Sequence, residues 1–321
     1  MQLGRMGYVL MMAAWVVGTS DMRAQGRPGA PEKLIIDTDL GDDIDDAFAL
    51  MLALRSPELQ VLGITTAFGD TELRARLADR LLAETGHGDV PVAVGVRTEG
   101  KTPFTQARYA ARWPDVKRHK AAVEFALDHI RKSPGEITLV AIGPLVNVGA
   151  MIDKDAATFR KLKRVVVMGG SVDRGYGDLD YGPVHGPEAE WNIANDPASA
   201  QKLLDVGVPV FFLPLDSTQL KLDEVKRALL LRQGNAYTDA LALLYFQWGM
   251  ETPTLYDPMT IAWVLKPSLC PMTRIRLRVD EKGFTRRESG APNAQVCLQS
   301  SSEDFFRFYL PRLLSPEAGL R

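Results

Sequence analysis

A cluster of six aspartates near the N-terminal end of the chain could bind a cation. The six lie between residues 37 and 46, after the apolar run Leu34–Ile36 and before the apolar stretch Ala47–Leu54. These runs predict a buried strand and a buried helix, with Gly41 permitting the turn between them. Carboxylates crowded at the end of a strand repel one another unless protons or a bound ion neutralise them. A set of oxygen ligands favours Ca²⁺ first and Mg²⁺ second.

The two central aspartates of the cluster have an alternative role. Asp42 and Asp43 could cap the following helix and face solvent, because Asp is favoured in first helical turns through capping and the helix dipole. The sequence leaves both roles open for this pair.

Several later strands also end in residues that suit a pocket. Glycines follow these strands, and glycine lets the backbone approach a ligand closely, so that a backbone carbonyl can join the ligands of a cation. The candidate pocket residues at these positions are Asp70, Ile142, Asn147 and Met168.

A glycine-rich loop over residues 171–187 contains His185 and leads into Glu190 and Asn192. Long loops of this kind often act as lids. Glu190 and Asn192 would face the same side of an extended segment and could bind adjacent sugar hydroxyls, and a solvated loop with a capping Asn is the alternative. Asp257 heads an otherwise apolar helix, where it could complete the cation site or cap the helix.

Short apolar runs alternate with longer amphipathic ones from residue 33 onward, which predicts an α/β fold with parallel strands joined by helices. We find no repeat or linker, so we expect one domain over residues 33–315. The expected strands are Leu34–Asp37, Val61–Thr66, Val92–Val94, Ile137–Ile142, Arg164–Met168, Val210–Leu213 and Ile275–Val279. The expected helices are Ile44–Arg55, Asp70–Thr85, His119–Ser133, Leu145–Asp153, Pro197–Val206 and Thr238–Trp248.

The overall charge argues against nucleic acid or an anionic membrane as a partner. The 321 residues carry a formal net charge of -2, and the pI is about 6.1. No basic field therefore attracts a polyanion, and a small-molecule partner is expected.

The N-terminal residues have the features of a secretory signal. Arg5 precedes the apolar segment Tyr8–Val17, and cleavage after Ala24 would remove residues 1–24. An uncleaved anchor or a misassigned start codon is the alternative. We expect an exported protein, periplasmic or secreted, with no stable membrane association after cleavage. In an oxidising compartment Cys270 and Cys297 could form a disulfide, although two buried free thiols fit the sequence equally well.

Taken in order, these motifs resemble those of the inosine-uridine-preferring nucleoside hydrolase family. The resemblance extends from Leu34 to about Leu314 and implies an open, mostly parallel Rossmann-like sheet with helices on both faces. The motifs that carry it are Asp37-Thr38-Asp39-Leu40-Gly41 with Asp45-Asp46-Ala47, Thr65-Thr66, Gly143-Pro144-Leu145-Val146-Asn147, Met168-Gly169-Gly170, Glu190-Trp191-Asn192 and Asp257-Pro258.

The resemblance implies Ca²⁺-dependent hydrolysis of the N-glycosidic bond of a ribonucleoside to ribose and a free base, by a homodimer or homotetramer. It implies that Asp39, Asp46 and Asp257 supply carboxylates to Ca²⁺ and that Ile142 supplies its carbonyl. Asp45 would deprotonate the attacking water. Met168, Glu190 and Asn192 would line the ribose site.

The sequence departs from the family pattern at two positions. The stretch between Gly41 and Ala47 is two residues longer than usual, so Asp42 or Asp43 could take a role assigned here to Asp45 or Asp46.

The second departure is Tyr256, which stands where many members have a histidine that protonates the leaving base. With an ordinary pKa near 10, Tyr is a poor acid at neutral pH. Tyr256 could instead stack on the base, with Trp113 or Trp248, which slightly favours purines, or it could merely pack. His185 is another candidate acid, or a solvated side chain.

Two other functions also fit parts of the sequence. Asp37-Thr38-Asp39 is similar to the nucleophile motif of haloacid-dehalogenase-type phosphatases, but that mechanism has no part for Asp45-Asp46. An exported protein that binds a nucleoside or ribose without turnover could use the same calcium pocket.

Overall fold

The structure is a computed structural model that describes residues 30–100, 102–111, 113, 118–177 and 183–315. Residues from 31 onward form one compact unit. The expected leader at residues 1–24 lies outside the described residues. Within the described ranges, no helix has both the length and the apolar character needed to cross a bilayer.

One sheet runs through the unit, in the strand order β4-β3-β2-β1-β5-β6-β7-β10-β8-β9. All neighbours from β4 to β10 pair in parallel, whereas β8 is antiparallel to both β10 and β9. The expected open, mostly parallel sheet is therefore confirmed. The strands are β1 (Glu32–Thr38), β2 (Leu59–Thr66), β3 (Val92–Val94), β4 (Lys120–Ala121), β5 (Ile137–Ala141), β6 (Arg164–Met168), β7 (Val210–Leu213), β8 (Met272–Val279), β9 (Thr285–Glu288) and β10 (Ala294–Cys297).

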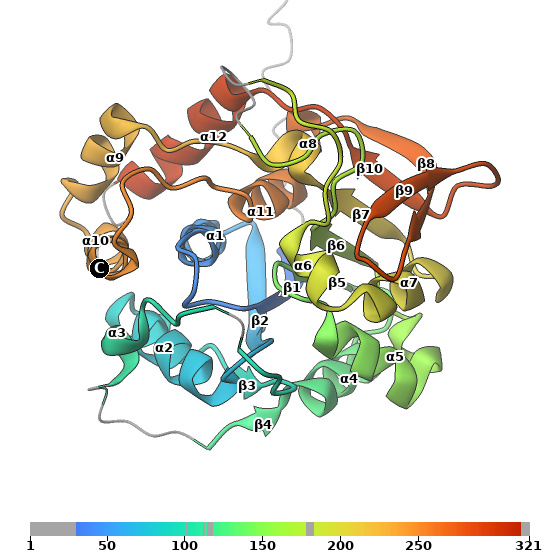
Figure 1. Ribbon diagram of the computed structural model, residues 1–321. Coiled ribbons are helices and arrows are strands. Elements are labelled where there is room, and N and C mark those ends of the chain that lie inside the picture. The colour runs from blue at the N-terminus through green and yellow to red at the C-terminus, as the bar shows by residue number, and fades with distance from the viewer. Residues whose placement is uncertain (1–29, 101, 112, 114–117, 178–182, 316–321) are drawn as a thin grey trace, which may run out of the picture. The chain divides into compact units, whose positions relative to one another are not determined.

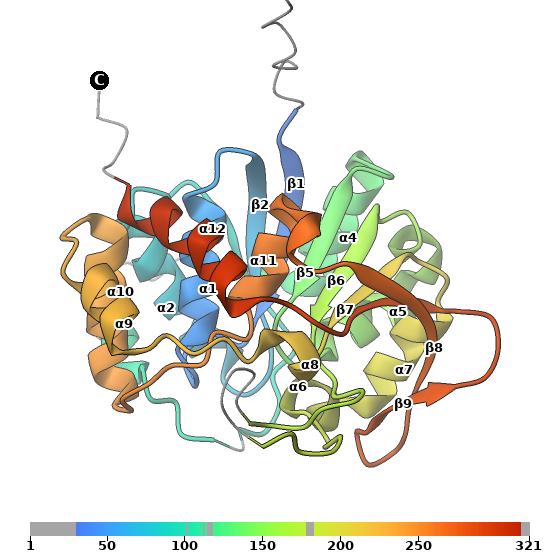
Figure 2. The same ribbon diagram turned by 90° about the horizontal axis from the view of Figure 1, so that it is seen from above.

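Helices cover both faces of the sheet (Figures 1 and 2). The α-helices are α1 (Asp45–Leu54), α2 (Thr71–Glu84), α3 (Ala107–Ala111), α4 (Ala122–Lys132), α5 (Val146–Phe159), α6 (Trp191–Asn195), α7 (Pro197–Asp205), α8 (Leu215–Thr218), α9 (Glu224–Leu231), α10 (Ala236–Trp248), α11 (Pro258–Leu265) and α12 (Ser302–Leu314).

The central strand β1 shows why there are two helical layers. Its successive side chains point to opposite faces, so Leu34 and Ile36 pack in a core with α1, α2, α10, α11 and α12. Ile35 packs in a second core with α4, α5 and α7. A strand buried on both faces reads as a continuous apolar run, as this one does.

Each of the seven expected strands is present, but the elements near the C-terminus were harder to anticipate. The polar strand β9 has no apolar pattern because three of its four residues are exposed. Helix α12 was missed, although Phe305, Tyr309 and Leu313 form a buried stripe along it. The helix expected to end at Asp153 continues to Phe159 across a break at Asp155.

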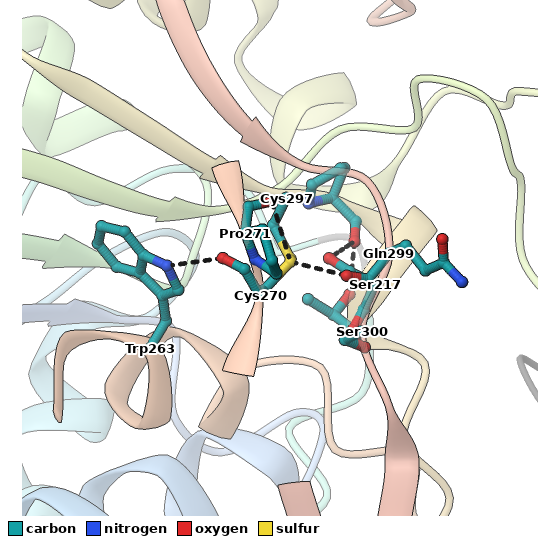
Figure 3. The surroundings of a disulfide bond; sticks show 9 residues. Ser217, Trp263, Cys270, Pro271, Cys297, Gln299 and Ser300 are labelled. Atoms are coloured by element: carbon teal, nitrogen blue, oxygen red, sulfur yellow. Dashed lines mark hydrogen bonds between the residues drawn. A yellow bond between two sulfur atoms is a disulfide. The ribbon is translucent and has the colours of Figure 1, made fainter. Parts of the chain in front are cut away.

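The two cysteines form a disulfide, which decides between the two possibilities left open by the sequence (Figure 3). Cys270 follows the short 3₁₀ helix η1 (Pro267–Leu269), and Cys297 ends β10, with the two Cα atoms 5.7 Å apart. The bond closes a loop of 27 residues that contains β8 and β9. Both cysteines are fully buried, and the indole of Trp263 donates to the carbonyl of Cys270 at 3.1 Å.

Candidate active site

A cavity of about 500 Å³ opens at the carboxyl ends of the central strands. Asp39 enters it from the connection after β1, Ile142 from the end of β5 and Met168 from the end of β6. Loops diverge at this edge of a parallel sheet and leave room for a ligand. Six aspartates line the cavity: Asp39, Asp42, Asp43, Asp45, Asp46 and Asp257.

The first turn of α1 and the start of α11 bring three carboxylates together. One carboxylate oxygen each from Asp45, Asp46 and Asp257 lies within 4.8 Å of the others, and all three residues are buried. The backbone N–H of Asp257 donates to Asp45 Oδ2 at 3.1 Å, which connects the start of α11 to the first turn of α1. The side chain of Asp257 makes no capping hydrogen bond, so the alternative that it caps its helix is wrong.

Burial and mutual repulsion both act against ionisation in this cluster. Burial is the largest cause raising the pKa of Asp45, Asp46 and Asp257, and the neighbouring carboxylates raise these pKa values further. A hard divalent cation would relieve both costs, and carboxylate oxygens are its preferred ligands. The residues present therefore fit a hard divalent cation such as Ca²⁺.

Asp39 lies beside this cluster and lines the same cavity. It is buried, and repulsion from Asp39 contributes to the raised pKa of Asp46. Gly143, just after Ile142, leaves the space that Asp39 occupies, because a Cβ atom at Gly143 would lie 2.8 Å from the backbone nitrogen and Oδ1 of Asp39. The close approach of Asp39 thus explains why the residue after Ile142 is a glycine.

The polar groups expected at the ribose also line the cavity. The carboxylate of Glu190 accepts hydrogen bonds from the backbone nitrogens of Gly170 at 2.8 Å, Asn192 at 2.9 Å and Ile193 at 3.1 Å. Burial raises the pKa of Glu190 to about 7, opposed by these hydrogen bonds. Asn192 Nδ2 donates to the carbonyl of Met168 at 3.1 Å. The chain is extended only as far as Glu190, which caps α6, so Asn192 lies in the helix. The side chains of Glu190 and Asn192 nevertheless both line the cavity.

Aromatic side chains form a further part of the cavity wall. Tyr176 and Tyr256 meet edge to face with ring centroids 6.2 Å apart, and the Tyr176 hydroxyl accepts a hydrogen bond from the backbone of Trp191 at 2.9 Å. Trp248 also lines the cavity. Burial, and then the carboxylates of Asp45 and others, raise the pKa of Tyr256, so its hydroxyl keeps its proton at neutral pH.

Sequence reasoning missed part of this wall. Tyr176, Trp191 and Met250 all line the cavity but were not named as site residues. Trp191 had a usable signal, since it stands between Glu190 and Asn192 in the sequence. Tyr176 had none beyond its place in the glycine-rich loop.

Three of the candidate residues lie away from the cavity. Asp70 caps α2 through the backbone N–H of Leu73. Asn147 is fully buried, donates to Asp37 Oδ1 at 2.7 Å and accepts from the backbone of Val96 at 2.8 Å. His185 is exposed in its loop. Trp113, suggested as a stacking partner, is half-buried and also does not line the cavity.

The two aspartates of the longer turn do not cap α1. Ile44 occupies the capping position without a side-chain hydrogen bond. Asp43 Oδ1 accepts a hydrogen bond from the backbone of Ile44 at 2.7 Å, and Asp42 is paired with Arg74. Their alternative role as helix caps is therefore wrong.

Comparisons with known proteins identify the family of the chain. The family model described as inosine-uridine preferring nucleoside hydrolase matches residues 34–307. "Uridine nucleosidase 1" of Arabidopsis thaliana is 32% identical over 282 residues, which cover 80% of each chain. "Pyrimidine-specific ribonucleoside hydrolase RihA" of Enterobacter sp. (strain 638) is 35% identical over 263 residues, covering 74% of this chain and 80% of the relative.

Solved structures give the same result. The chain resembles "Plant nucleoside hydrolase - PpNRh1 enzyme" with a TM-score of 0.77 and 27% identity, covering 89% of this chain and 100% of that one. The family resemblance seen in the motifs is thus confirmed, and the phosphatase and the non-enzymatic binding protein are set aside. The chain belongs to the inosine-uridine preferring nucleoside hydrolase family and is an N-ribosyl hydrolase.

Proposed function

We propose that this protein hydrolyses the N-glycosidic bond of ribonucleosides with Ca²⁺ as its cofactor. The observation that carries the proposal is the buried group of Asp45, Asp46 and Asp257, with Asp39 beside it, in one cavity with Glu190. When bound there by Asp39, Asp46, Asp257 and the Ile142 carbonyl, the ion would supply orientation of the sugar diol and a lowered pKa for water.

The side chains around the cavity have distinct roles in this proposal. Water attacks C1′ as the C1′–N bond breaks, which leaves the electron pair of that bond on the base and builds positive charge on the ribose ring. The departing base takes up a proton from solvent. Asp45 accepts the proton of the attacking water, with its carboxylate held by the backbone N–H of Asp257 at 3.1 Å. Glu190 and Asn192 bind ribose hydroxyls and keep the ring in place while its charge develops.

The aromatic wall is the proposed site of the base. Tyr256 keeps its proton at neutral pH, so it acts by stacking and packing rather than as an acid. A larger ring system gains more contact by stacking against the aromatic side chains of the cavity, which are Tyr176, Trp191, Trp248 and Tyr256. We therefore propose a preference for purines. The relatives quoted above are named for uridine or pyrimidine nucleosides, which makes the base preference the first point to measure.

Base release measured by chromatography tests the proposal. Purified protein, stripped of metal and then supplied with Ca²⁺, is incubated with inosine, guanosine, adenosine, uridine and cytidine. We expect free base only with the metal, and faster release from purine nucleosides. Asp45→Asn should abolish turnover while retaining metal, whereas Asp128→Asn, on the exposed face of α4, is the matched control. Absence of base release from all five nucleosides would refute the proposal, and faster release from uridine or cytidine would overturn the purine preference alone.

We also propose that the protein is exported and assembles into a homodimer or homotetramer. The apolar segment at the N-terminus and the Cys270–Cys297 disulfide support export, because such bonds persist in oxidising compartments. Cell fractionation and light scattering test the two points, respectively. A reduced protein retained in the cytoplasm would overturn the first, and a monomer at micromolar concentration would overturn the second.

A further inference from the structure

The longer turn between β1 and α1 gives Asp42 a buried cationic partner. Arg74, on α2, approaches Asp42 with both terminal nitrogens, at 2.9 Å from Nη2 to Oδ2 and 3.2 Å from Nη1 to Oδ1. The side chains are only 3% and 15% exposed. This two-point contact uses the planar fork of the guanidinium, which a lysine cannot reproduce.

The same guanidinium binds the backbone that carries Asp39. Arg74 Nη1 donates to the carbonyl of Asp39 itself and, at 3.0 Å, to that of Leu40. Its Nε donates to the carbonyl of Phe68 at 2.8 Å. One side chain therefore connects the end of β2, the turn after β1 and the carboxylate of Asp42.

The segment over residues 102–106 holds the turn from its other side. Thr102 Oγ1 donates to Asp42 Oδ2 at 2.7 Å, and Thr105 Oγ1 donates to the carbonyl of Asp42 at 2.7 Å. Gln106 Nε2 donates to the carbonyl of Asp43 at 2.5 Å. The ring of Phe104 stacks under Arg74, 5.0 Å from Cζ of the guanidinium to the ring centroid.

We propose that Arg74 is a positioning residue for the metal ligand Asp39, and that Asp42 is the counter-ion of Arg74 instead of a ligand. The inference rests on the proposed function, because it concerns the ion that Asp39 would hold. Arg74 acts through the turn: it holds the carbonyls of Asp39 and Leu40, and its ion pair with Asp42 anchors the far side of the same turn.

Charge and geometry predict opposite effects of removing Arg74, and this makes the proposal testable. A nearby positive charge repels a cation, so with Asp39 ionised an effect of charge alone would make Arg74→Gln bind Ca²⁺ more tightly and leave Arg74→Lys unchanged. The same tightening in Arg74→Gln is expected if Asp42, once released, became a ligand. Positioning predicts that both variants bind more weakly, because neither keeps the fork.

The experiment measures Ca²⁺ affinity of the metal-free protein by calorimetry, together with the melting temperature in chelator. We expect both variants to lose about 10- to 100-fold in Ca²⁺ affinity, as is usual for residues that orient metal ligands. Arg97→Gln is the matched control, since its pair with Asp70 is 67% and 42% exposed and lies at the start of the same helix. It should bind like the parent.

The outcomes separate this inference from the proposed function. A parent protein that binds no Ca²⁺ overturns both. A parent that binds Ca²⁺ and an Arg74→Lys variant that matches it overturn the positioning role alone. If Arg74→Gln does not fold, Asp42→Asn together with Arg74→Lys carries the test. Loss of Ca²⁺ affinity in both variants supports the positioning role of Arg74, and loss in Asp42→Asn alone overturns it by showing that Asp42 binds the ion directly.

Discussion

Replacing Asp46 by Asn should stabilise the metal-free protein while removing its response to Ca²⁺. Asp46 lies within 4.8 Å of the carboxylates of Asp45 and Asp257. At an effective dielectric constant near 20, each ionised pair at that separation costs about 3 kcal/mol. Asn keeps the shape, and its Oδ1 can still accept the hydrogen bond that Thr38 Oγ1 donates to Asp46.

The expected gain is less than two full repulsions, because the crowded carboxylates of the parent already take up protons. Burial, then repulsion, raises the pKa of Asp46, which favours its uncharged form and relieves part of the repulsion in the parent. We therefore expect roughly 2–4 kcal/mol of added stability in chelator. With Ca²⁺ at a hundred times its dissociation constant, the parent should gain about 2.7 kcal/mol and Asp46→Asn almost none.

Urea unfolding followed by circular dichroism, at pH 8 with chelator or with Ca²⁺, measures both effects. Asp128→Asn, an exposed aspartate on α4, serves as the control and should change neither value by more than about 0.5 kcal/mol. Lower stability of Asp46→Asn than of the parent in chelator, or equal stabilisation of both proteins by Ca²⁺, would contradict this prediction.

Three further predictions concern other parts of the molecule. Burial raises the pKa of Glu190 from 4.5 to about 7, so the native state holds this proton more tightly than the unfolded chain does. The contribution of Glu190 to the free energy of unfolding of the metal-free protein should therefore fall by about 3 kcal/mol as pH rises from 4.5 to 7. The free energy of unfolding should depend less on pH in Glu190→Gln, and an equal dependence in both proteins would contradict this. Tyr256→Phe should keep base release within about threefold of the parent, and Tyr256→Ala should lose about tenfold in kcat/KM; a large loss in Tyr256→Phe would make the hydroxyl essential. Replacing Cys270 and Cys297 by Ala should lower the free energy of unfolding by about 3 kcal/mol, with activity retained in the folded enzyme, and unchanged denaturant midpoints would show that the bond is dispensable.

Local chemistry was readable from the sequence. Apolar runs and their spacing were enough to predict six of the parallel strands, because a strand buried on both faces must be apolar throughout. The parallel strands β4 and β10 were missed, and the expected strand Ile275–Val279 is part of the antiparallel β8. The density of aspartates after Leu34–Ile36 indicated a cation, because carboxylates so close in sequence cannot separate far in space. The order of the motifs then identified the family, and its model matches residues 34–307.

Tertiary structure decided which of these side chains meet. Asp257 is 212 residues from Asp45, and only the packing of α11 against α1 brings its backbone nitrogen within 3.1 Å of that carboxylate. Asn147 lies close to the end of β5, as Met168 lies at the end of β6, but the side chain of Asn147 turns to Asp37 in the core. The pairing of the two cysteines depends on the place of β8 beside β10.

The aspartate turn shows both contributions. The sequence determined that its carboxylates are crowded and need compensation, because their types and spacing follow directly from the chain. It could not determine how each one is compensated, because the partners come from distant segments: Arg74 on α2 for Asp42, and the start of α11 for Asp45. Three-dimensional packing thus assigns different roles to adjacent residues of the same type.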